Sequence, residues 1–246
     1  MNKLITPTVK DEVIFGIHPI IELLKAKRRK LHIIYTTKPA PKKWGQIAEL
    51  LPKHIQVQPV EKAFLNRLAG TEDHQSVVAL AAPFVTRKKH FDPKKHKFLL
   101  MLDEIQDTKN LGAILRSAYC TKVDGVIITQ KGSSPISAAA IKSSAGLAEH
   151  MEIMLVSSAS QAVAQLKASG YSLYLATVDN SKNMLDVEYQ FPLCIVIGNE
   201  AMGVSKSILG SGQHITLPQC RSDISYNASV AAGIIMFNIA TKYRIL

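Results

Sequence analysis

Short apolar runs alternate with segments of helical character through the second part of the chain, from residue 98 to residue 246. The apolar runs are KFLLMLD, DGVIIT, EIMLV, YSLYLAT, FPLCIVIG and HITLP. The segments with helical periodicity are NLGAILRSAYC, SAAAIKSSAGLAE, ASQAVAQLKAS and NASVAAGIIMFNIATKYR. Strands and helices in turn indicate crossover units and a mostly parallel sheet that is covered on both faces. In such folds ligands bind at the carboxyl ends of the strands.

The first part of the chain has the same alternation on a smaller scale. Helix-like HPIIELLKAK, PKKWGQIAELL and EKAFLNRLA alternate with strand-like LHIIYTT, IQVQPV and SVVALAAP. Apolar periodicity then stops in PFVTRKKHFDPKKHK, which brings Pro, Lys and His together. These features predict a small α/β domain over residues 1–82, a basic linker over 83–97 and a larger domain over 98–246.

Positive charge is concentrated in the first part of the chain. Residues 1–97 hold nineteen Lys and Arg against eight Asp and Glu, whereas residues 98–246 hold eleven of each kind. The densest basic runs are KAKRRK at 25–30 and RKKHFDPKKHK at 87–97. Such asymmetry favours an N-terminal surface that binds a polyanion, with nucleic acid as the leading candidate. The alternative is a solvated basic surface that serves solubility alone.

The composition also argues against several classes of protein. The most apolar stretch, ASVAAGIIMFNIA from Ala228, is too short to cross a bilayer and the start lacks the apolar region of a signal peptide. Cys120, Cys194 and Cys220 are odd in number and widely spaced, which argues against a disulfide framework and against a zinc cluster. We therefore expect a cytoplasmic protein with no membrane segment and no metal site.

The first of three polar clusters at strand ends is DEIQDTKNLGAILRSA, residues 103–118. Asn110 either caps the following helix or has a functional role, and the residues leave both interpretations open. Arg116 favours function, because a permanent cation among Ile114, Leu115 and Ala118 must reach solvent or meet an anion.

The other two clusters follow later strands. In IVIGNEAMGVSKSIL, residues 195–209, Val204 stands where a phosphate-binding GxxxxGK loop requires Lys, so a nucleoside triphosphate site is excluded. What remains is a glycine where backbone can approach a ligand closely, followed by Glu200, or else a tight turn with Glu200 near a helix N-terminus. In HITLPQCRSDISYNASVAAGIIMF, residues 214–237, capping of the last helix explains Ser225 or Asn227 but not both.

These clusters, in this order, carry a resemblance to a known family. The segments DEIQDTKNLGAILRSA, IVIGNEAMG and ITLP…SYNASVAAGI resemble the three motifs of the SpoU (TrmH) family of RNA ribose 2′-O-methyltransferases, of the SPOUT class. FGIHPIIELL and DHQSVVAL look like the N-terminal substrate-binding domain of the subgroup that methylates a guanosine ribose in 23S ribosomal RNA.

The resemblance implies an α/β protein whose C-terminal parallel-sheet SPOUT methyltransferase domain carries a deep trefoil knot, preceded by a small α/β RNA-binding domain. S-adenosylmethionine would be held by groups around Thr177, Gly198, Leu217 and Tyr226. The family's catalytic positions match Asn110, Arg116, Glu200, Ser225 and Asn227. Family members are typically homodimers with the site near the subunit interface and RNA bound across it.

The chain departs from the family pattern at three places. It has Thr108-Lys109 before Asn110 where Pro and His or Gly are usual, Tyr226 where Leu is usual, and Ser76 where the guanosine-specific subgroup has Gly. Two alternatives therefore stay open beside a ribosomal RNA 2′-O-methyltransferase. They are a tRNA ribose methyltransferase of the same family and an RNA-binding protein that kept the fold but lost the activity.

Overall fold

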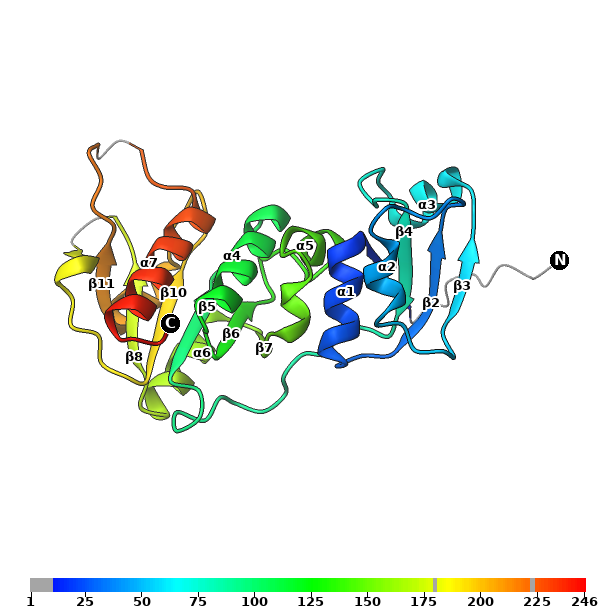
Figure 1. Ribbon diagram of the computed structural model, residues 1–246. Helices are drawn as coiled ribbons and strands as arrows, with labels where there is room; N and C mark the ends of the chain where they lie inside the picture. The colour runs from blue at the N-terminus through cyan, green and yellow to red at the C-terminus, as the bar shows by residue number, and fades with distance from the viewer. Residues whose placement is uncertain (1–10, 179–180, 222–223) are drawn as a thin grey trace. The chain divides into compact units, whose positions relative to one another are not determined.

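The computed structural model describes residues 11–178, 181–221 and 224–246 (Figure 1), and the chain divides into two compact units. The first unit comprises the chain up to Val85 together with Ile136–His150. The second comprises Thr86–Pro135 and Met151–Leu246. The segment Ile136–His150 thus groups with the N-terminal residues, which the alternation of strands and helices along the chain did not indicate.

The first unit is built on a four-stranded mixed sheet with the order β1-β4-β2-β3. Its strands are β1 (Glu12–Phe15), β2 (Leu31–Thr36), β3 (Gln56–Pro59) and β4 (Val77–Ala81). β4 runs antiparallel to β1 and β2, and β2 runs parallel to β3. The predicted small α/β domain is confirmed, although the sequence did not indicate β1.

Helices cover both faces of this sheet. The helical segments are α1 (Ile17–Ala26), α2 (Trp44–Ala48), α3 (Lys62–Ala69), α5 (Ala138–Ser143) and the 3-10 turn η1 (Leu147–His150). Apolar residues of α1 pack with Ile34 and Ala79 on one face, and Ile141 of α5 joins this cluster. Leu65 of α3 packs with Tyr35 and Val78 on the other face. The strands thus point alternate side chains into two separate cores.

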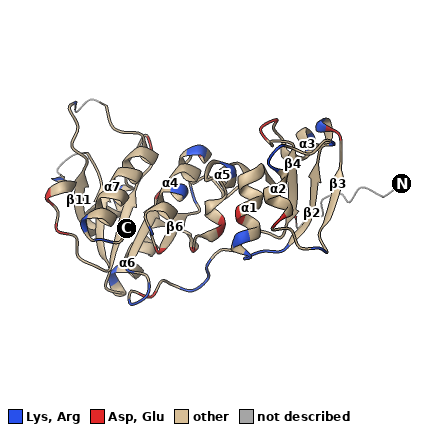
Figure 2. Ribbon diagram, viewed as in Figure 1, with Lys and Arg blue, Asp and Glu red and all other residues tan. Residues whose placement is uncertain are grey.

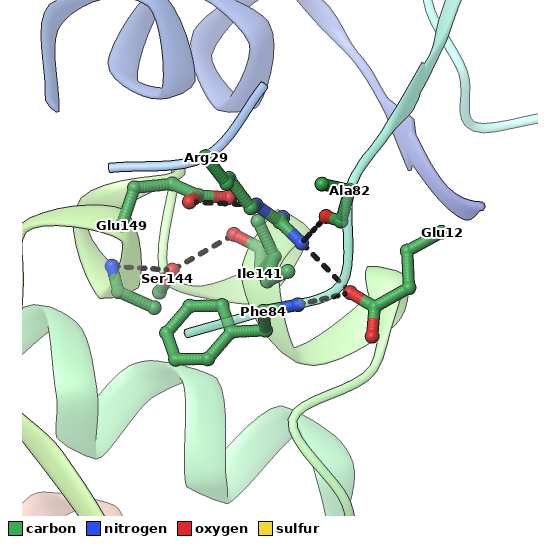
Figure 3. A network of polar contacts seen from close by, with 8 residues as sticks. Glu12, Arg29, Ala82, Phe84, Ile141, Ser144 and Glu149 are labelled. Atoms are coloured by element: carbon green, nitrogen blue, oxygen red, sulfur yellow. Dashed lines mark hydrogen bonds and ion pairs between the residues drawn. The ribbon is translucent and has the colours of Figure 1, made fainter. Parts of the chain in front are cut away.

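Arg29 lies in the basic run at 25–30, but its side chain is only 1% exposed. Its Nη2 and Nε donate to Glu149 at 2.5 and 3.0 Å, and its Nη1 donates to Glu12 Oε2 at 2.7 Å (Figure 3). Nη1 also donates to the Ala82 carbonyl at 3.2 Å. Part of the run predicted to bind a polyanion is therefore used inside the unit, whereas Lys27 and Lys30 remain exposed.

The second unit contains a seven-stranded sheet with the order β7-β6-β5-β10-β8-β11-β9. Its strands are β5 (Phe98–Leu102), β6 (Gly125–Thr129), β7 (Ile153–Val156), β8 (Ser172–Ala176), β9 (Lys182–Asn183), β10 (Leu193–Ile197) and β11 (Gln213–Thr216). Every pairing between them is parallel, as predicted. The central strands are buried on both faces, which explains why their sequences are continuous apolar runs.

Three long helices pack on this sheet. Figure 1 shows α4 (Thr108–Cys120) and α7 (Ala228–Lys242) side by side, and they pack closely enough that a Cβ at Gly233 of α7 would lie 3.5 Å from Ser117 Oγ of α4. α6 (Ala159–Ala168) packs through Ala162, Val163 and Leu166 on a core that includes Leu99 and Val196. Two further 3-10 turns are η2 (Met184–Asp186) and η3 (Lys206–Ser211). None of the described helices combines the length and the apolar character needed to span a membrane.

The basic run at 87–97 leads into β5, and Figure 2 shows Lys and Arg along this stretch. Its first residue is bound to the edge of the large sheet. The backbone N–H of Arg87 donates to the Ile153 carbonyl at 2.7 Å, and Arg87 forms an isolated parallel bridge with Met154. The start of the run is therefore anchored to β7.

Candidate active site

A pocket of about 560 Å³ opens where β8, β10 and β11 end. The residue that follows each of these strands lines it, namely Thr177, Gly198 and Leu217. Tyr226 lines it as well, so the four positions predicted to bind the methyl donor surround one cavity. The pocket lies at the carboxyl edge of a parallel sheet, as expected for this kind of fold.

The loop after β10 forms one wall of the pocket. Asn199 and Gly203 exchange two backbone hydrogen bonds of 2.9 Å, and Asn199 Oδ1 accepts from the backbone of Ala201 and Met202. A Cβ at Gly198 would lie 2.2 Å from the Gly203 carbonyl carbon, so the loop can fold back only if residue 198 is glycine. The glycine predicted to allow a close backbone approach therefore allows the loop to close on itself.

Two buried polar residues that the sequence analysis missed hold this loop. Asp103 follows β5, is 1% exposed and accepts from the Ser205 backbone N–H at 2.9 Å. Asn199 is 8% exposed and donates to the Glu104 carbonyl at 2.8 Å. The available signal was positional, because each of the two follows directly, or one residue after, an apolar strand.

Asp107, and not Asn110, caps α4. Asp107 Oδ1 accepts from the Asn110 backbone N–H at 2.8 Å, and Asn110 lies in the first turn of the helix. The capping interpretation of Asn110 is therefore wrong, and its side-chain amide is available for other partners.

The amide of Asn110 connects the three motif segments. Its Nδ2 donates to Glu200 Oε1 at 2.9 Å, and its Oδ1 accepts from Asn227 Nδ2 at 3.1 Å. Glu200 Oε2 also accepts from the Gln106 backbone N–H at 3.4 Å. Three of the five predicted catalytic residues thus form one polar network that borders the pocket, because Glu200 is part of the pocket lining.

Asn227 is also the N-cap of α7. Its Oδ1 accepts from the backbone N–H groups of Ser229 and Val230 at 2.9 and 3.4 Å. Capping therefore explains Asn227 and leaves Ser225, which is exposed and lines the pocket. Tyr226 is 43% exposed, and its hydroxyl donates to the Pro218 carbonyl at 3.4 Å.

Arg116 does not join this network. It lies on α4 six residues after Asn110, which corresponds to about 9 Å along the helix axis. Its side chain is exposed, and the described part of the chain offers it no hydrogen-bond or ion-pair partner. The guanidinium can therefore meet an anion that comes from outside.

The site as a whole combines a cavity with an adjacent acceptor and donor network and a nearby cation. Its volume lies within the ~300–1,000 Å³ of typical small-molecule pockets. The pocket is lined by main-chain groups after three strands, by the Thr177 hydroxyl and by the aromatic ring of Tyr226. These groups can bind a ligand that has an adenosine part and an amino-acid part. The residues present therefore fit S-adenosylmethionine.

Comparison with known families gives two matches that together cover most of the chain. The family described as SpoU rRNA Methylase matches residues 97–237, and the one described as RNA 2′-O ribose methyltransferase substrate binding matches residues 13–86. A TrmH family tRNA/rRNA methyltransferase from Staphylococcus haemolyticus is 32% identical over 247 residues, which cover 95% of this chain and 97% of that protein.

Solved structures share the fold. An rRNA methyltransferase from Sinorhizobium meliloti with bound S-adenosylmethionine aligns with a TM-score of 0.79 at 18% identity, covering 95% of this chain and 88% of that one. A structure described as an RNA 2′-O ribose methyltransferase aligns with a TM-score of 0.83 at 21% identity, covering 96% and 90%.

The fold, the pocket and these matches define a methyltransferase of the α/β class with a separate substrate-binding domain. The chain belongs to the SpoU rRNA Methylase family, whose members are RNA methyltransferases that use S-adenosylmethionine as methyl donor.

Proposed function

We propose that this enzyme transfers a methyl group from S-adenosylmethionine to the 2′-OH of a ribose in RNA, with a guanosine of 23S ribosomal RNA as the substrate. The observation that carries the proposal is the network of Asn110, Glu200 and Asn227. It joins one residue from each motif segment at the border of the pocket.

S-adenosylmethionine supplies an electrophilic methyl group on a sulfonium, which leaves as a neutral thioether. The protein has to position the 2′-oxygen and stabilise the negative charge that develops on it. We assign this task to Arg116, whose guanidinium can hold a phosphate beside the target ribose. A guanidinium stays protonated, so Arg116 is not the base, and the 2′-OH proton passes to a phosphate oxygen of the RNA.

The other site residues position the substrate and the donor. We assign Asn110 to orienting the ribose and Glu200 to fixing the Asn110 amide, because the carboxylate accepts the Asn110 hydrogen bond. Ser225 and Asn227 close the loop over the donor, and groups around Thr177, Gly198, Leu217 and Tyr226 bind it. The cavity retains about 560 Å³ with Tyr226 in its wall, which supports donor binding despite the departure from Leu.

Ribosomal RNA is favoured over tRNA by the N-terminal unit, since the substrate-binding family matches residues 13–86. We propose that residues 1–82 recognise RNA, that 83–97 connect the two activities and that 98–246 catalyse methyl transfer. A cytoplasmic location agrees with three free cysteines, of which Cys120 and Cys220 are exposed.

We further propose that the enzyme is a homodimer and carries the family's trefoil knot. Val230, Ile234 and Phe237 form an exposed apolar row on α7, with Phe237 59% exposed. Tyr119, 41% exposed, lies one turn after Arg116 on the neighbouring helix α4. A second copy that covers this apolar surface would exclude water next to Arg116. Dimerisation would in this way strengthen the electrostatic action of Arg116 in the active site.

The substrate assignment is tested by incubating ribosomal RNA and tRNA, both from a strain that lacks the enzyme, with protein and S-adenosylmethionine. Digestion and mass spectrometry of nucleosides should reveal 2′-O-methylguanosine in 23S RNA. Methylation of tRNA alone would favour the tRNA alternative. If calorimetry detects no binding of S-adenosylmethionine, the inactive RNA-binding protein becomes the better interpretation.

The dimer is tested by light scattering of the wild type and of Phe237→Asp. We expect a dimer that becomes a monomer without methyl-transfer activity. The matched change Leu185→Asp, at a leucine that is 50% exposed outside α7, should leave mass and activity unchanged. A monomeric wild type with full activity would contradict this part of the proposal.

A further inference from the structure

A second cavity, of about 290 Å³, lies in the second unit and is separate from the donor pocket. It borders β7, the edge strand, whereas the donor pocket borders β8, β10 and β11, and β6 and β5 lie between them in the sheet. One wall is formed at the start of the basic run by Thr86, Arg87, Lys88 and His90, and the other wall is α6. Neither the motifs nor the family match assigns a role to this cavity.

The basic wall is held in place by Arg87. Its Nη1 donates to Glu152 at 2.9 Å, its Nη2 donates to the His90 carbonyl at 3.1 Å, and its guanidinium lies 4.7 Å from the centre of the Phe91 ring. These contacts occupy the Arg87 guanidinium, which therefore serves the wall rather than a ligand. They also fix the backbone on both sides of Lys88, at residues 87 and 90. The wall is therefore preformed, which lowers the entropic cost of binding a ligand against it.

The residues that face the cavity combine charge, amide groups and an apolar floor. Lys88 and His90 are exposed on the basic wall. On α6, Gln161 Oε1 accepts from Ser157 Oγ at 2.5 Å, so the Gln161 NH₂ group is left to donate to a ligand. Leu155, 37% exposed, and Val156 form the floor.

This combination fits a nucleotide better than a simple anion or an apolar group. An unpaired base needs a flat apolar surface or a ring to stack on and an amide to contact its edge, and its phosphate needs a cation. The floor, Gln161 and Lys88 supply these three elements at a size near the ~300 Å³ lower limit of ligand pockets. Residues 87–97 hold six Lys and Arg against one Asp. Positive charge that is repeated along a segment suits the regularly spaced phosphates of RNA, which favours RNA over an acidic peptide.

We propose that this cavity binds an unpaired nucleotide of the substrate RNA, away from the ribose that is methylated. The inference rests on the proposed function, since it takes RNA as the substrate. Lys88 contacts the phosphate, Gln161 contacts the edge of the base, and the base lies on Leu155 and Val156. Occupation of this site would help to select the RNA without taking part in the chemistry.

The test uses matched pairs of variants in the full-length protein. Lys88→Ala is compared with Lys89→Ala, because both lysines are exposed but only Lys88 lines the cavity. Gln161→Ala is compared with Ser160→Ala, its exposed neighbour on α6 that does not line the cavity. Fluorescence anisotropy measures binding of labelled single-stranded oligouridylate and oligoadenylate, and methyl transfer is measured on 23S RNA.

We expect Lys88→Ala and Gln161→Ala each to weaken RNA binding about fivefold, the effect of one lost hydrogen bond. The KM for 23S RNA should rise to a similar extent with kcat unchanged, and both controls should stay within about twofold. Gln161→Ala should leave the salt dependence of binding unchanged, because it removes no charge.

Equal effects of Lys88→Ala and Lys89→Ala, together with a neutral Gln161→Ala, would overturn the inference and leave a diffuse basic surface. If the wild type methylates 23S RNA normally in that case, the proposed function survives. If the wild type methylates no RNA but the cavity variants still weaken RNA binding more than their controls, the nucleotide site stands and the proposed function fails.

Discussion

Asn110 donates a hydrogen bond from Nδ2 to Oε1 of Glu200 at 2.9 Å, although ninety residues separate them in the chain. Asn227 completes the arrangement by donating to Asn110 Oδ1 at 3.1 Å. Each residue belongs to a different polar cluster of the sequence. The parallel sheet brings the clusters together because each follows a strand that ends at the same edge.

Because these residues act through one network, their losses should not add. Asn110→Ala and Glu200→Ala should each lower kcat/KM for RNA about tenfold or more. The kcat/KM of the double variant should be no lower than that of the less active single variant, since either change already breaks the contact. Steady-state methyl transfer with all three proteins tests this, and losses that multiply would show that the two side chains act independently.

The cap of α4 shows what the sequence could and could not predict at this site. Asp107 and Asn110 are both good capping residues, and the sequence alone does not decide between them. In the structure Asp107 directly precedes the helix and accepts from the Asn110 backbone N–H, while the Asn110 side chain donates to Glu200, a partner that only the folded chain brings close. The strand ends that carry the site were predictable from apolar runs, whereas the buried contacts of Asp103 and Asn199 were not.

Ser76 adopts a backbone conformation that favours glycine, with φ of 60°. The left-handed conformation costs a non-glycine residue ~1–2 kcal/mol. Glycine avoids this cost, but it loses more conformational entropy on folding, which offsets part of the gain. Ser76→Gly should therefore raise the free energy of unfolding by about 0.5–1 kcal/mol. Urea denaturation measures this change.

The same substitution at Ser160, inside α6, provides the control. Glycine there should lower stability by about 0.5–1 kcal/mol, because it disfavours the helix. A loss of stability from Ser76→Gly as well would mean that the serine side chain makes a contribution larger than the backbone strain. The left-handed backbone at Ser76 also explains why the subgroup that the segment DHQSVVAL resembles has glycine at this position.

The buried pair of Arg29 and Glu149 should be sensitive to removal of one partner. Glu149→Gln leaves a guanidinium that is 1% exposed with less compensating charge, so we expect a loss of about 3–5 kcal/mol in unfolding free energy. Thermal and urea unfolding measure the loss, and Glu49→Gln at an exposed position serves as the control. A loss below about 1 kcal/mol would indicate that Glu12 alone compensates the charge.

Arg29 also shows where charge counting fails. Three consecutive basic residues, Arg28 to Lys30, are equivalent in the sequence. The fold turns Arg29 inward to a carboxylate 120 residues away, while Lys30 remains exposed. A basic run predicts net charge reliably, but it does not reveal which members are available to RNA.

His74 should make stability depend on pH. Burial lowers the pKa of His74 below its ordinary value of 6.5. The neutral ring donates from Nε2 to Asn66 Oδ1 at 2.7 Å and accepts from the Ser76 N–H at Nδ1 at 3.0 Å, so a second ring proton would break the latter bond. In the range from pH 6.5 down to the lower folded pKa, the unfolded chain binds more protons, and stability falls as pH falls.

The comparison of the wild type with His74→Asn isolates this contribution, because the other titrating groups are common to both proteins. The wild type should exceed the variant in unfolding free energy at about pH 7.5, and the difference should shrink towards about pH 5. Urea denaturation at both pH values measures it. A difference that is independent of pH would show that His74 is not held neutral by the fold.

The most direct test of the account measures methyl transfer to 23S RNA by wild type, Arg116→Lys and Arg116→Ala, together with S-adenosylmethionine binding by calorimetry. We expect Arg116→Ala to lower kcat at least about 100-fold, while its affinity for the donor stays within about twofold. Arg116→Lys should recover part of the rate, because it keeps the charge but not the bidentate fork. Undiminished turnover in Arg116→Ala would contradict the account.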